Sequence, residues 1–310
     1  MKFTKWLLGI ILAIGVYSVI IFLSDFSTLV HNLQNIKLEY VLLGIVAIFS
    51  GLIVRAFRWS LMIKMLDVKI NLKASTLVYL CGTAFGLSPG RLGEVAKSLY
   101  LKRLVNTPIS KTAPTIIVER FLDVFAILII ALSSSLLIGI ENNIIFLGYV
   151  ALGIFLFLIY QKKYLIKILE KTSSIPLLRK ISQKLIPSVD IIFHLLKPKI
   201  FAKTFSLSIL AWLIESLVIY FVLKSFDINL SVIKSSFIYV ISSLIGSSSF
   251  LPGGIGTTEG GLLALFHLEN ISYDNAIAPI LVIRIIVLWM TIIFGIIINR
   301  LTEITILKNK

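Results

Sequence analysis

The chain of 310 residues is 58% hydrophobic and only 15% charged, and its mean hydropathy is +1.00. In a soluble protein, the formal net charge of +15 would indicate a nucleic-acid partner. A chain this apolar is instead typical of an integral membrane protein, in which Lys and Arg gather in cytoplasmic loops. The composition therefore excludes a soluble globular fold and argues against nucleic-acid binding. The single cysteine, Cys81, excludes an internal disulfide.

Six apolar runs approach the roughly 20 residues that a helix needs to cross a bilayer. In chain order they are Trp6–Leu23, Tyr40–Val54, Phe121–Ile140, Ile144–Tyr160, Phe205–Leu223 and Ala276–Ile298. Lys2 and Lys5 give the first run the start of a signal peptide, but no clear small-x-small cleavage site follows. We expect an uncleaved first helix and a single transmembrane domain.

Loop charge predicts which side of the membrane each segment faces. Lys2 and Lys5 place the N-terminus in the cytoplasm, and Arg300 and Lys308 place the C-terminus there too. Residues 161–203 carry ten Lys and Arg against two acidic residues, so this segment should also be cytoplasmic. Its mixed apolar and basic pattern predicts helices on an anionic membrane surface, with a solvated linker as the alternative. The expected location is the cytoplasmic membrane.

Two further apolar segments are short for a span. Ala74–Leu87 has 14 residues, or about 21 Å of helix, against a hydrocarbon core of about 30 Å. Basic residues flank it on both sides, so it should enter from the cytoplasm and turn back at Pro89. Ser235–Leu251 should enter from outside and turn at Pro252, because the loop beyond is poor in cations. The expected fold is all-α and polytopic, with about six full spans and two re-entrant broken-helix segments; eight spans are the alternative.

The sequence at the two breaks repeats. Pro-Gly-Arg-Leu-Gly-Glu at 89–94 returns as Pro-Gly-Gly-Ile-Gly-Thr-Thr-Glu at 252–259, and the two prolines are 163 residues apart. Arg120 and Arg284, in the long helix after each break, are 164 residues apart. Paired breaks that enter from opposite faces form an inverted repeat, and in many transporters they mark the substrate site. The expected segments are repeat one at about 40–140, the cytoplasmic basic segment at 161–203 and repeat two at about 204–299.

The breaks suit an anion site. Proline lacks an N–H and glycine tolerates strained backbone, so together they end a helix and free its terminal groups. Half-helices expected at 92–103 and 257–266 would point their positive ends at an anionic head group. A tight turn between short spans is the alternative. The candidate substrate-binding or translocation residues are Pro89, Gly90, Arg91, Gly93, Glu94, Glu119, Arg120, Asp123, Glu215, Pro252, Gly253, Gly254, Gly256, Thr257, Thr258, Glu259 and Arg284.

Several of these candidates are charges inside or beside apolar runs. Glu119 and Asp123 are four residues apart on one helical face, so a cation, or Arg120 and Arg284, should lie between them. A charge within a span, such as Arg284, usually faces the bundle interior and serves function, with structural ion pairing as the alternative.

Glu215 is an expected partner for Arg284, or for Arg55 and Arg58 near a cytoplasmic helix end. Snorkelling toward the membrane surface is the alternative for those two arginines.

The carboxylates just after the breaks have two readings. Glu94 and Glu259 would either cap their own half-helices or accept a proton or a cationic group during transport. Thr257 and Thr258 would either donate to a phosphate or cap a helix.

No cofactor or metal site is expected, since there is no phosphate-binding loop and no Ser/His/Asp set. The histidines also lack the spacing of metal ligands.

Four pieces of the chain resemble the lysylphosphatidylglycerol synthase transmembrane-region family, a group of flippase-like membrane proteins. These pieces are Leu87–Glu94 followed by Lys97, Val118–Asp123, Leu251–Gly260 and Arg284. The resemblance implies a domain that moves aminoacylated phospholipid between leaflets, and other relatives accompany polyprenyl-linked sugar pathways. Some relatives carry a fused soluble aminoacyl-transferase. We expect none here, because the chain reaches Lys310 directly after its last span.

The expected function is translocation of an anionic phospholipid or a polyprenyl-phosphate-type lipid. One alternative is a membrane-embedded lipid-modifying transferase, with Glu94 or Glu259 as its base. Another is an accessory subunit that positions a partner enzyme of lipid or glycolipid synthesis through residues 161–203. Assembly of the protein into a homo-oligomer is compatible with the sequence.

Overall fold

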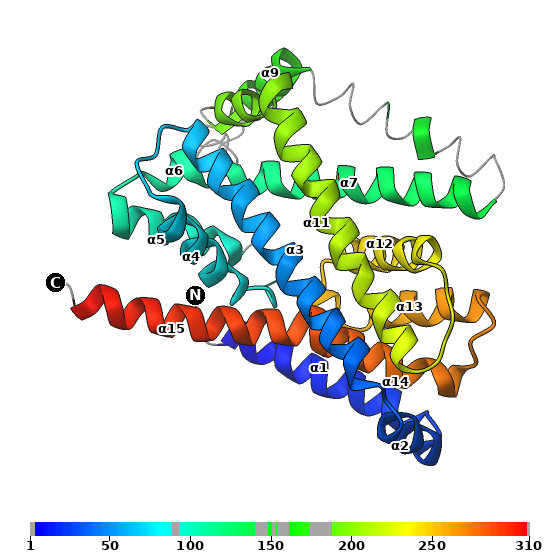
Figure 1. Ribbon diagram of the computed structural model, residues 1–310. Coiled ribbons are helices and arrows are strands. Elements are labelled where there is room, and N and C mark those ends of the chain that lie inside the picture. The colour runs from blue at the N-terminus through cyan, green and yellow to red at the C-terminus, as the bar shows by residue number, and fades with distance from the viewer. Residues whose placement is uncertain are drawn as a thin grey trace.

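The computed structural model describes residues 4–88, 93–139, 148–150, 153, 161–173, 186 and 188–308. All the regular secondary structure in these residues is helical, which confirms the all-α expectation (Figure 1). In chain order the helices are α1 (Thr4–Phe22), α2 (Phe26–Gln34), α3 (Leu38–Met65), α4 (Leu72–Thr83), α5 (Ala96–Val105), α6 (Ile109–Thr112), α7 (Pro114–Ile138), α9 (Lys162–Ser173), α11 (Pro198–Ser225), α12 (Val232–Ser248), the 3₁₀ turn η2 (Pro252–Gly254), α13 (Thr257–Leu268), α14 (Tyr273–Arg284), the π-helix η3 (Ile285–Met290) and α15 (Thr291–Lys308).

Four helical stretches among the described residues are long and apolar enough to cross a membrane. They are Leu38–Met65, Ile109–Ile138, Pro198–Ser225 and Tyr273–Thr302. α1 and α2 form a bent pair, with an angle of 101° between Gly9–Phe22 and Phe26–Gln34, and would add a fifth span. The span expected at Ile144–Tyr160 lies almost entirely outside the described residues. The described chain is therefore a polytopic membrane bundle.

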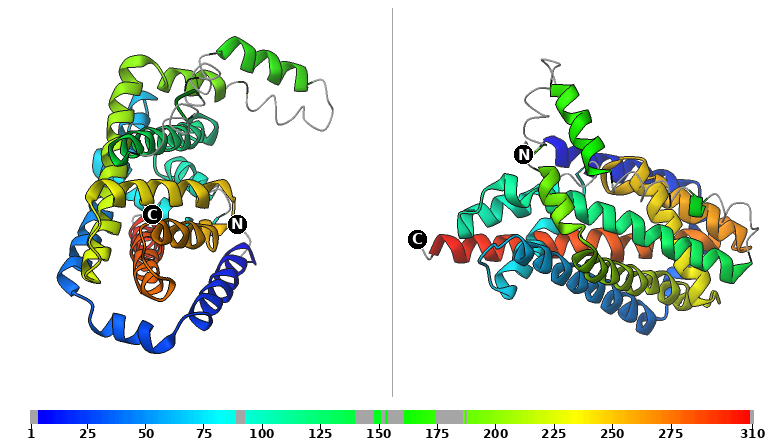
Figure 2. Two further views of the ribbon diagram at one scale, coloured as in Figure 1. Left: turned by 90° about the vertical axis from the view of Figure 1, so that its right-hand side faces the viewer. Right: turned by 90° about the horizontal axis from the view of Figure 1, so that it is seen from above.

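The long helices run between two ends of the bundle. Both chain termini lie at one end, together with α5 and α6, whereas α2 and the start of α14 lie at the other (Figures 1 and 2). α3 and α11 pack side by side and antiparallel along much of their length. The first and last described helices therefore place both ends of the chain on the same side of the bundle.

Two helical hairpins enter the bundle from opposite ends. α4 begins at the end where α3 finishes, and α5 returns toward that end. α12 begins at the opposite end, where α11 finishes, and α13 packs against it on the way back. This is the arrangement expected for two re-entrant segments. Both descending helices are short because they stop inside the bundle: α4 ends at Thr83 and α12 at Ser248.

The tips of the two hairpins meet against α1. A Cβ added at Gly9 would lie 3.4 Å from the Cβ of Pro252 and 3.6 Å from that of Leu87. A Cβ added at Gly253 would lie 3.2 Å from Cδ2 of Leu87. The contact is apolar, and α1 covers it closely at Gly9, where an added Cβ would already be in van der Waals contact with both tips. Its buried core consists of Ala13, Leu87, Ile255, Leu288 and Ile292.

Two helices differ from the expected boundaries for physical reasons. α3 continues well past Val54, because Arg55 and Arg58 are buried with partners instead of snorkelling to the surface. α2 forms between the first two apolar runs, where the sequence predicts no span. The side chain of Asp25 caps it by accepting the N–H groups of Ser27 and Thr28.

Candidate functional site

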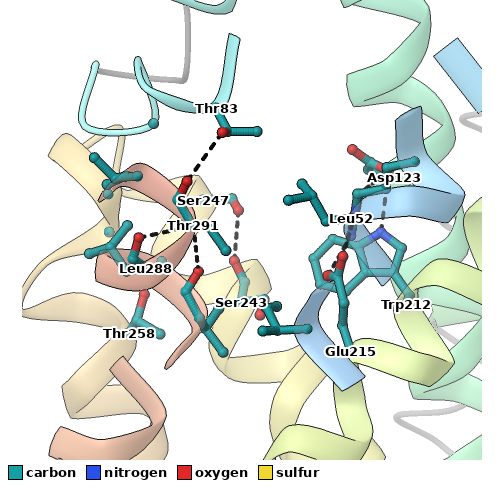
Figure 3. A pocket seen from close by; sticks show the side chains of 18 of the residues that line it. Leu52, Thr83, Asp123, Trp212, Glu215, Ser243, Ser247, Thr258, Leu288 and Thr291 are labelled. Atoms are coloured by element: carbon teal, nitrogen blue, oxygen red, sulfur yellow. Dashed lines mark hydrogen bonds and ion pairs between the residues drawn. The ribbon is translucent and has the colours of Figure 1, made fainter. Parts of the chain in front are cut away.

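A cavity of about 400 Å³ lies between the hairpins and the long helices (Figure 3). Residues of α3, α4, α7, α11, α12, α13 and the helices from α14 to α15 line it. The ionisable residues among those described in its wall, leaving out two tyrosines, are Arg55, Glu94, Lys97, Arg120, Asp123, Glu215 and Arg284. These are four cations against three carboxylates, and with their partners Arg58, Glu119 and Glu259 the site holds five of each.

Arg55 ties three long helices together beside the cavity. Its Nε and Nη2 donate to the two oxygens of Glu215 at 2.5 and 2.8 Å, a bidentate pair, and its Nη1 donates to Asp123 at 2.8 Å. The Cζ of Arg55 lies 4.6 Å from the ring centre of Trp212, whose Nε1 donates to Asp123 at 3.3 Å. α3, α7 and α11 are thereby joined by one buried ion cluster.

Arg58, one turn along α3, extends this cluster. Its Nη1 donates to Asp123 and to the hydroxyl of Ser208, each at 2.6 Å. Its Nη2 lies 3.6 Å from Glu119. Arg58 therefore stands between the two carboxylates that share a face of α7, a position in which a cation was expected.

Lys97 brings the first hairpin into the same cluster. Its Nζ donates to Glu119 at 2.6 Å and to Glu94 at 3.2 Å, and it lies 4.7 Å from the ring centre of Tyr79. A Cβ added at Gly82 would lie only 2.5 Å from Cγ of Lys97. Glycine on α4 thus makes room for the lysine stem, and the side chain is almost completely buried.

Arg120 is the most accessible cation of the cluster. Its side chain is 31% exposed, whereas those of Arg55, Arg58 and Lys97 are each 7% exposed or less. Its contacts are long, 3.4 Å to Glu94 and 3.2 Å to Asp123. Its Nε has no hydrogen-bond partner among the described residues. Arg120 can therefore accept a new anionic partner with the least disruption.

A second, smaller cluster lies at the second break. Arg284 donates from Nε to Glu259 at 2.7 Å and from Nη2 to the carbonyl of Gly253 at 2.8 Å. Glu259 also accepts the backbone N–H of Gly256 at 2.8 Å and the hydroxyl of Tyr17 at 3.0 Å. The carboxylate thus caps α13 and balances the arginine at once.

The backbone of this break requires glycine. Gly253 and Gly256 have φ of +62° and +88°, values that side-chain-bearing residues rarely adopt. The strained turn aims the carbonyl of Gly253 at Arg284, and the π-helix η3 begins directly after that arginine. Such π segments occur frequently at functional sites.

The family model described as "Lysylphosphatidylglycerol synthase TM region" matches residues 7–295. The chain belongs to the lysylphosphatidylglycerol synthase transmembrane-region family. It is similar to a UPF0104 membrane protein of Methanocaldococcus jannaschii, with 29% identity over 234 residues that cover 72% of this chain and 95% of that protein. It is also similar to a UPF0104 membrane protein of Pyrococcus horikoshii, with 23% identity that covers 99% of this chain and 97% of the relative.

For this family member, the structure groups most of the candidates chosen from the sequence. Glu94, Glu119, Arg120, Asp123 and Glu215 share the first cluster, and Gly253, Gly256, Glu259 and Arg284 form the second. Pro252 lies at the tip of the second hairpin, and Gly254 and Thr258 line the cavity. The hydroxyl of Thr257 donates to Ser249 and to the carbonyl of Gly254. Gly93 donates its N–H to Ser88. Pro89, Gly90 and Arg91 lie outside the described residues.

The structure selects among the expected pairings. Glu215 binds Arg55, one of its expected partners, because α3 packs along α11 at that level. The cation between Glu119 and Asp123 is Arg58, and Arg284 instead binds Glu259.

Some members of the site were not among the candidates. Arg55 and Arg58 were read as near a helix end, and their position within a continuous apolar run was the available signal. Lys97 follows Glu94 by three residues, a spacing that pairs charges on a helix. Tyr17 comes from α1, and nothing in its local sequence connects it with Glu259.

Proposed function

We propose that this protein moves an anionic phospholipid or a polyprenyl-phosphate-type lipid across the cytoplasmic membrane. The observation that carries the proposal is the cavity between the two hairpins, with Arg120 partly exposed and loosely paired in its wall. The head group would pass through this cavity while the lipid tails stay in the bilayer. Its volume falls in the range of ligand sites, roughly 300–1,000 Å³.

Arg120 supplies the docking point for the phosphate. A guanidinium binds phosphate oxygens through two parallel hydrogen bonds, which are stronger than its present contacts of 3.2 and 3.4 Å. The displaced Glu94 would keep its contact with Lys97, and Asp123 would keep Arg55 and Arg58. The phosphate is therefore gained without leaving a buried carboxylate alone, a situation that costs about 3–5 kcal/mol.

The same pairing argues against the transferase alternative. Glu259 accepts from Arg284, Tyr17 and a backbone N–H, and Glu94 lies against two cations. Neither residue is thus prepared as the general base that such an enzyme would need.

Reconstitution in liposomes tests the proposal. The purified protein should speed the exchange between leaflets of an anionic phospholipid that is labelled on its acyl chain. Arg120→Ala should slow the exchange roughly tenfold or more, because a hydrogen-bonded charge contact contributes about 1.5–3 kcal/mol. Arg300→Ala is the matched control, since Arg300 is exposed near the end of α15 and outside the cavity.

The readout must separate transport from folding. Arg120→Ala should elute as the same monodisperse species as the wild type in size-exclusion chromatography. A folded Arg120→Ala protein that is as fast as the wild type would refute the role of Arg120. Failure of the wild type to accelerate any anionic phospholipid or polyprenyl phosphate would refute the transport function itself.

A further inference from the structure

We infer that α1 is a moving cover over the junction of the two hairpin tips, and that Tyr17 is the positioning residue that couples α1 to the second hairpin. The inference rests on the proposed function and adds a moving part to it. α1 lies at the edge of the bundle, and its N-terminal half reaches the tip of the second hairpin (Figure 2). Because Gly9 of α1 packs against both tips, the tips can part only if α1 leaves at least one of them.

α1 contacts the bundle through a narrow stripe of residues. Ala13 follows Gly9 by four residues, and Val16 and Tyr17 follow Ala13 by three and four, which places them on one face of the helix. The exposed apolar residues on its other faces include Ile10, Ile11, Ile14 and Val19. Lipid tails are as apolar as these side chains, so the hydrophobic effect contributes little to holding α1 on the bundle. Hydrogen bonds to other helices therefore matter more for its attachment.

The hydroxyl of Tyr17 attaches α1 to the second hairpin and to the helix that follows it. It donates to Oε1 of Glu259 on α13 at 3.0 Å and accepts from Nε1 of Trp289 on η3 at 3.3 Å. The rings of Tyr17 and Trp289 also meet edge to face, with 6.5 Å between their centres. Val16 packs on the same break, since a Cβ added at Gly256 would lie 3.6 Å from its Cγ2. Polar and apolar contacts thus join α1 to this hairpin.

α2 fastens the other end of α1 to the same part of the bundle. Leu29 of α2 is buried with Ile277 and Ala278 of α14. The side chain of Asp274, also on α14, accepts the backbone N–H of Asp25 at 3.1 Å. α14 carries Arg284, the ion-pair partner of the second hairpin. The contacts of α1 and α2 therefore allow both helices to move as one body with that hairpin and α14.

The described contact of α1 with the first hairpin is apolar. It runs from Gly9 to Leu87, whose buried side chain packs with Ala13 and Ile255. Parting this contact breaks no described hydrogen bond or ion pair, whereas lifting α1 off the second hairpin breaks the bond from Tyr17 to a buried carboxylate. When the tips separate, α1 should therefore leave Leu87 and stay on the second hairpin. The junction is then uncovered in the same step that opens it.

Two engineered disulfides test which tip α1 leaves. In a protein with Cys81 replaced by serine, Gly9→Cys is combined either with Leu87→Cys (the Leu87 pair) or with Pro252→Cys (the Pro252 pair). A Cβ at Gly9 would lie 3.6 Å from that of Leu87 and 3.4 Å from that of Pro252, close to the roughly 3.5–4.5 Å typical of disulfides. Oxidation of the Leu87 pair should stop the exchange of labelled phospholipid between leaflets, and dithiothreitol should restore it. Oxidation of the Pro252 pair should leave the rate of that variant as it was when reduced, because the bond joins parts that move together.

Tyr17→Phe removes the polar link and keeps the ring. Glu259 retains Arg284 and the N–H of Gly256, so the carboxylate is not left alone. We expect leaflet exchange to slow roughly three- to tenfold, as the loss of one hydrogen bond between membrane helices would give. The reason is that α1 no longer follows the second hairpin and stays over the junction. Tyr220→Phe is the matched control, since Tyr220 lies on α11 outside the cavity lining.

A rescue separates this positioning role from a merely structural one. In the oxidised Pro252 pair, a covalent bond replaces the hydrogen bond that Tyr17→Phe removes. Adding Tyr17→Phe to the Pro252 pair should therefore slow exchange in the reduced protein, and oxidation should restore most of the rate. A general loss of stability would not be corrected by this one bond.

The outcomes distinguish the inference from the function on which it rests. Exchange that continues in the oxidised Leu87 pair, or stops in the oxidised Pro252 pair, would overturn the moving cover and leave transport standing. Tyr17→Phe that is as fast as the wild type, or that the Pro252 disulfide does not rescue, would overturn the role of Tyr17. A wild type without exchange would overturn the transport function, and the coupling then has its own measurement. With limiting oxidant, the Pro252 disulfide should form more slowly in the Tyr17→Phe protein, and an equal rate of formation would overturn the coupling.

Discussion

Replacing Asp123 with asparagine should lower the free energy of unfolding by about 3–5 kcal/mol. The carboxylate lies 2.8 Å from Arg55, 2.6 Å from Arg58 and 3.2 Å from Arg120, with 5% of its side chain exposed. Asparagine keeps the shape but removes the charge. Three arginines then share the remaining carboxylates of the cluster, which is left with one uncompensated positive charge.

The magnitude follows from the burial of the cluster. Four cations and four carboxylates balance in the folded protein: Arg55, Arg58, Lys97 and Arg120 with Glu94, Glu119, Asp123 and Glu215. Two unit charges about 4 Å apart interact by about 4 kcal/mol at an effective dielectric constant near 20. Part of this loss is recovered as the arginines shift toward the other carboxylates. The expected decrease in the free energy of unfolding is therefore close to the energy of one such interaction.

Unfolding by sodium dodecyl sulfate in mixed micelles, followed by circular dichroism, measures the change. Asp227→Asn is the control, because it makes the same substitution in the exposed pair with Lys37 and should give no resolvable shift. Asp123→Asn within about 1 kcal/mol of the wild type would show that the cluster is solvated or already protonated. The description of it as a buried, balanced ion network would then be wrong.

Two further predictions test the packing and the orientation. Gly295→Ala should lower the free energy of unfolding by about 1–3 kcal/mol, since its Cβ would lie 2.4 Å from the backbone nitrogen that follows α4. Gly260→Ala should raise the free energy of unfolding by up to about 1 kcal/mol, because open space surrounds this helical position. In a protein with Cys81 replaced by serine, cysteines at the exposed positions Ser110 and Ser272 should react with a membrane-impermeant maleimide from opposite sides, Ser110 from the cytoplasm. Labelling of both from one side would refute the expected topology.

The two hairpins were predictable because short length and loop charge are local properties of the sequence. Ala74–Leu87 is too short for a comfortable span and basic at both flanks, and those two facts already require a return to the same side. The meeting of the tips was not predictable. It depends on how α1 packs, and a glycine such as Gly9 does not show in the sequence which residues it allows to approach.

The partners of the buried charged residues were likewise not predictable from the sequence. A charge in an apolar run indicates a buried partner, and this correctly marked Glu215 and Arg284. The identity of the partner depends on which helices are neighbours. Because α11 packs along α3, Glu215 meets Arg55, whereas Arg284 meets the carboxylate at the nearby break. The ion-pair partners could therefore be identified only from the packing of the helices.

The distribution of ion pairs also indicates which contacts would survive a transport cycle. Each hairpin is bound by ion pairs to a long helix after its own break: Lys97 on α5 to Glu119 on α7, and Glu259 on α13 to Arg284 on α14. Among the described residues, no ion pair joins one hairpin to the other, and Leu87, beside the first break, packs against the second break through apolar contacts. Separating those tips costs only the exposure of a small apolar surface, whereas breaking a buried ion pair leaves a buried charge without a partner and costs more free energy. Under the proposed function, each hairpin would therefore move together with its own long helix, and the cavity would open where the tips part.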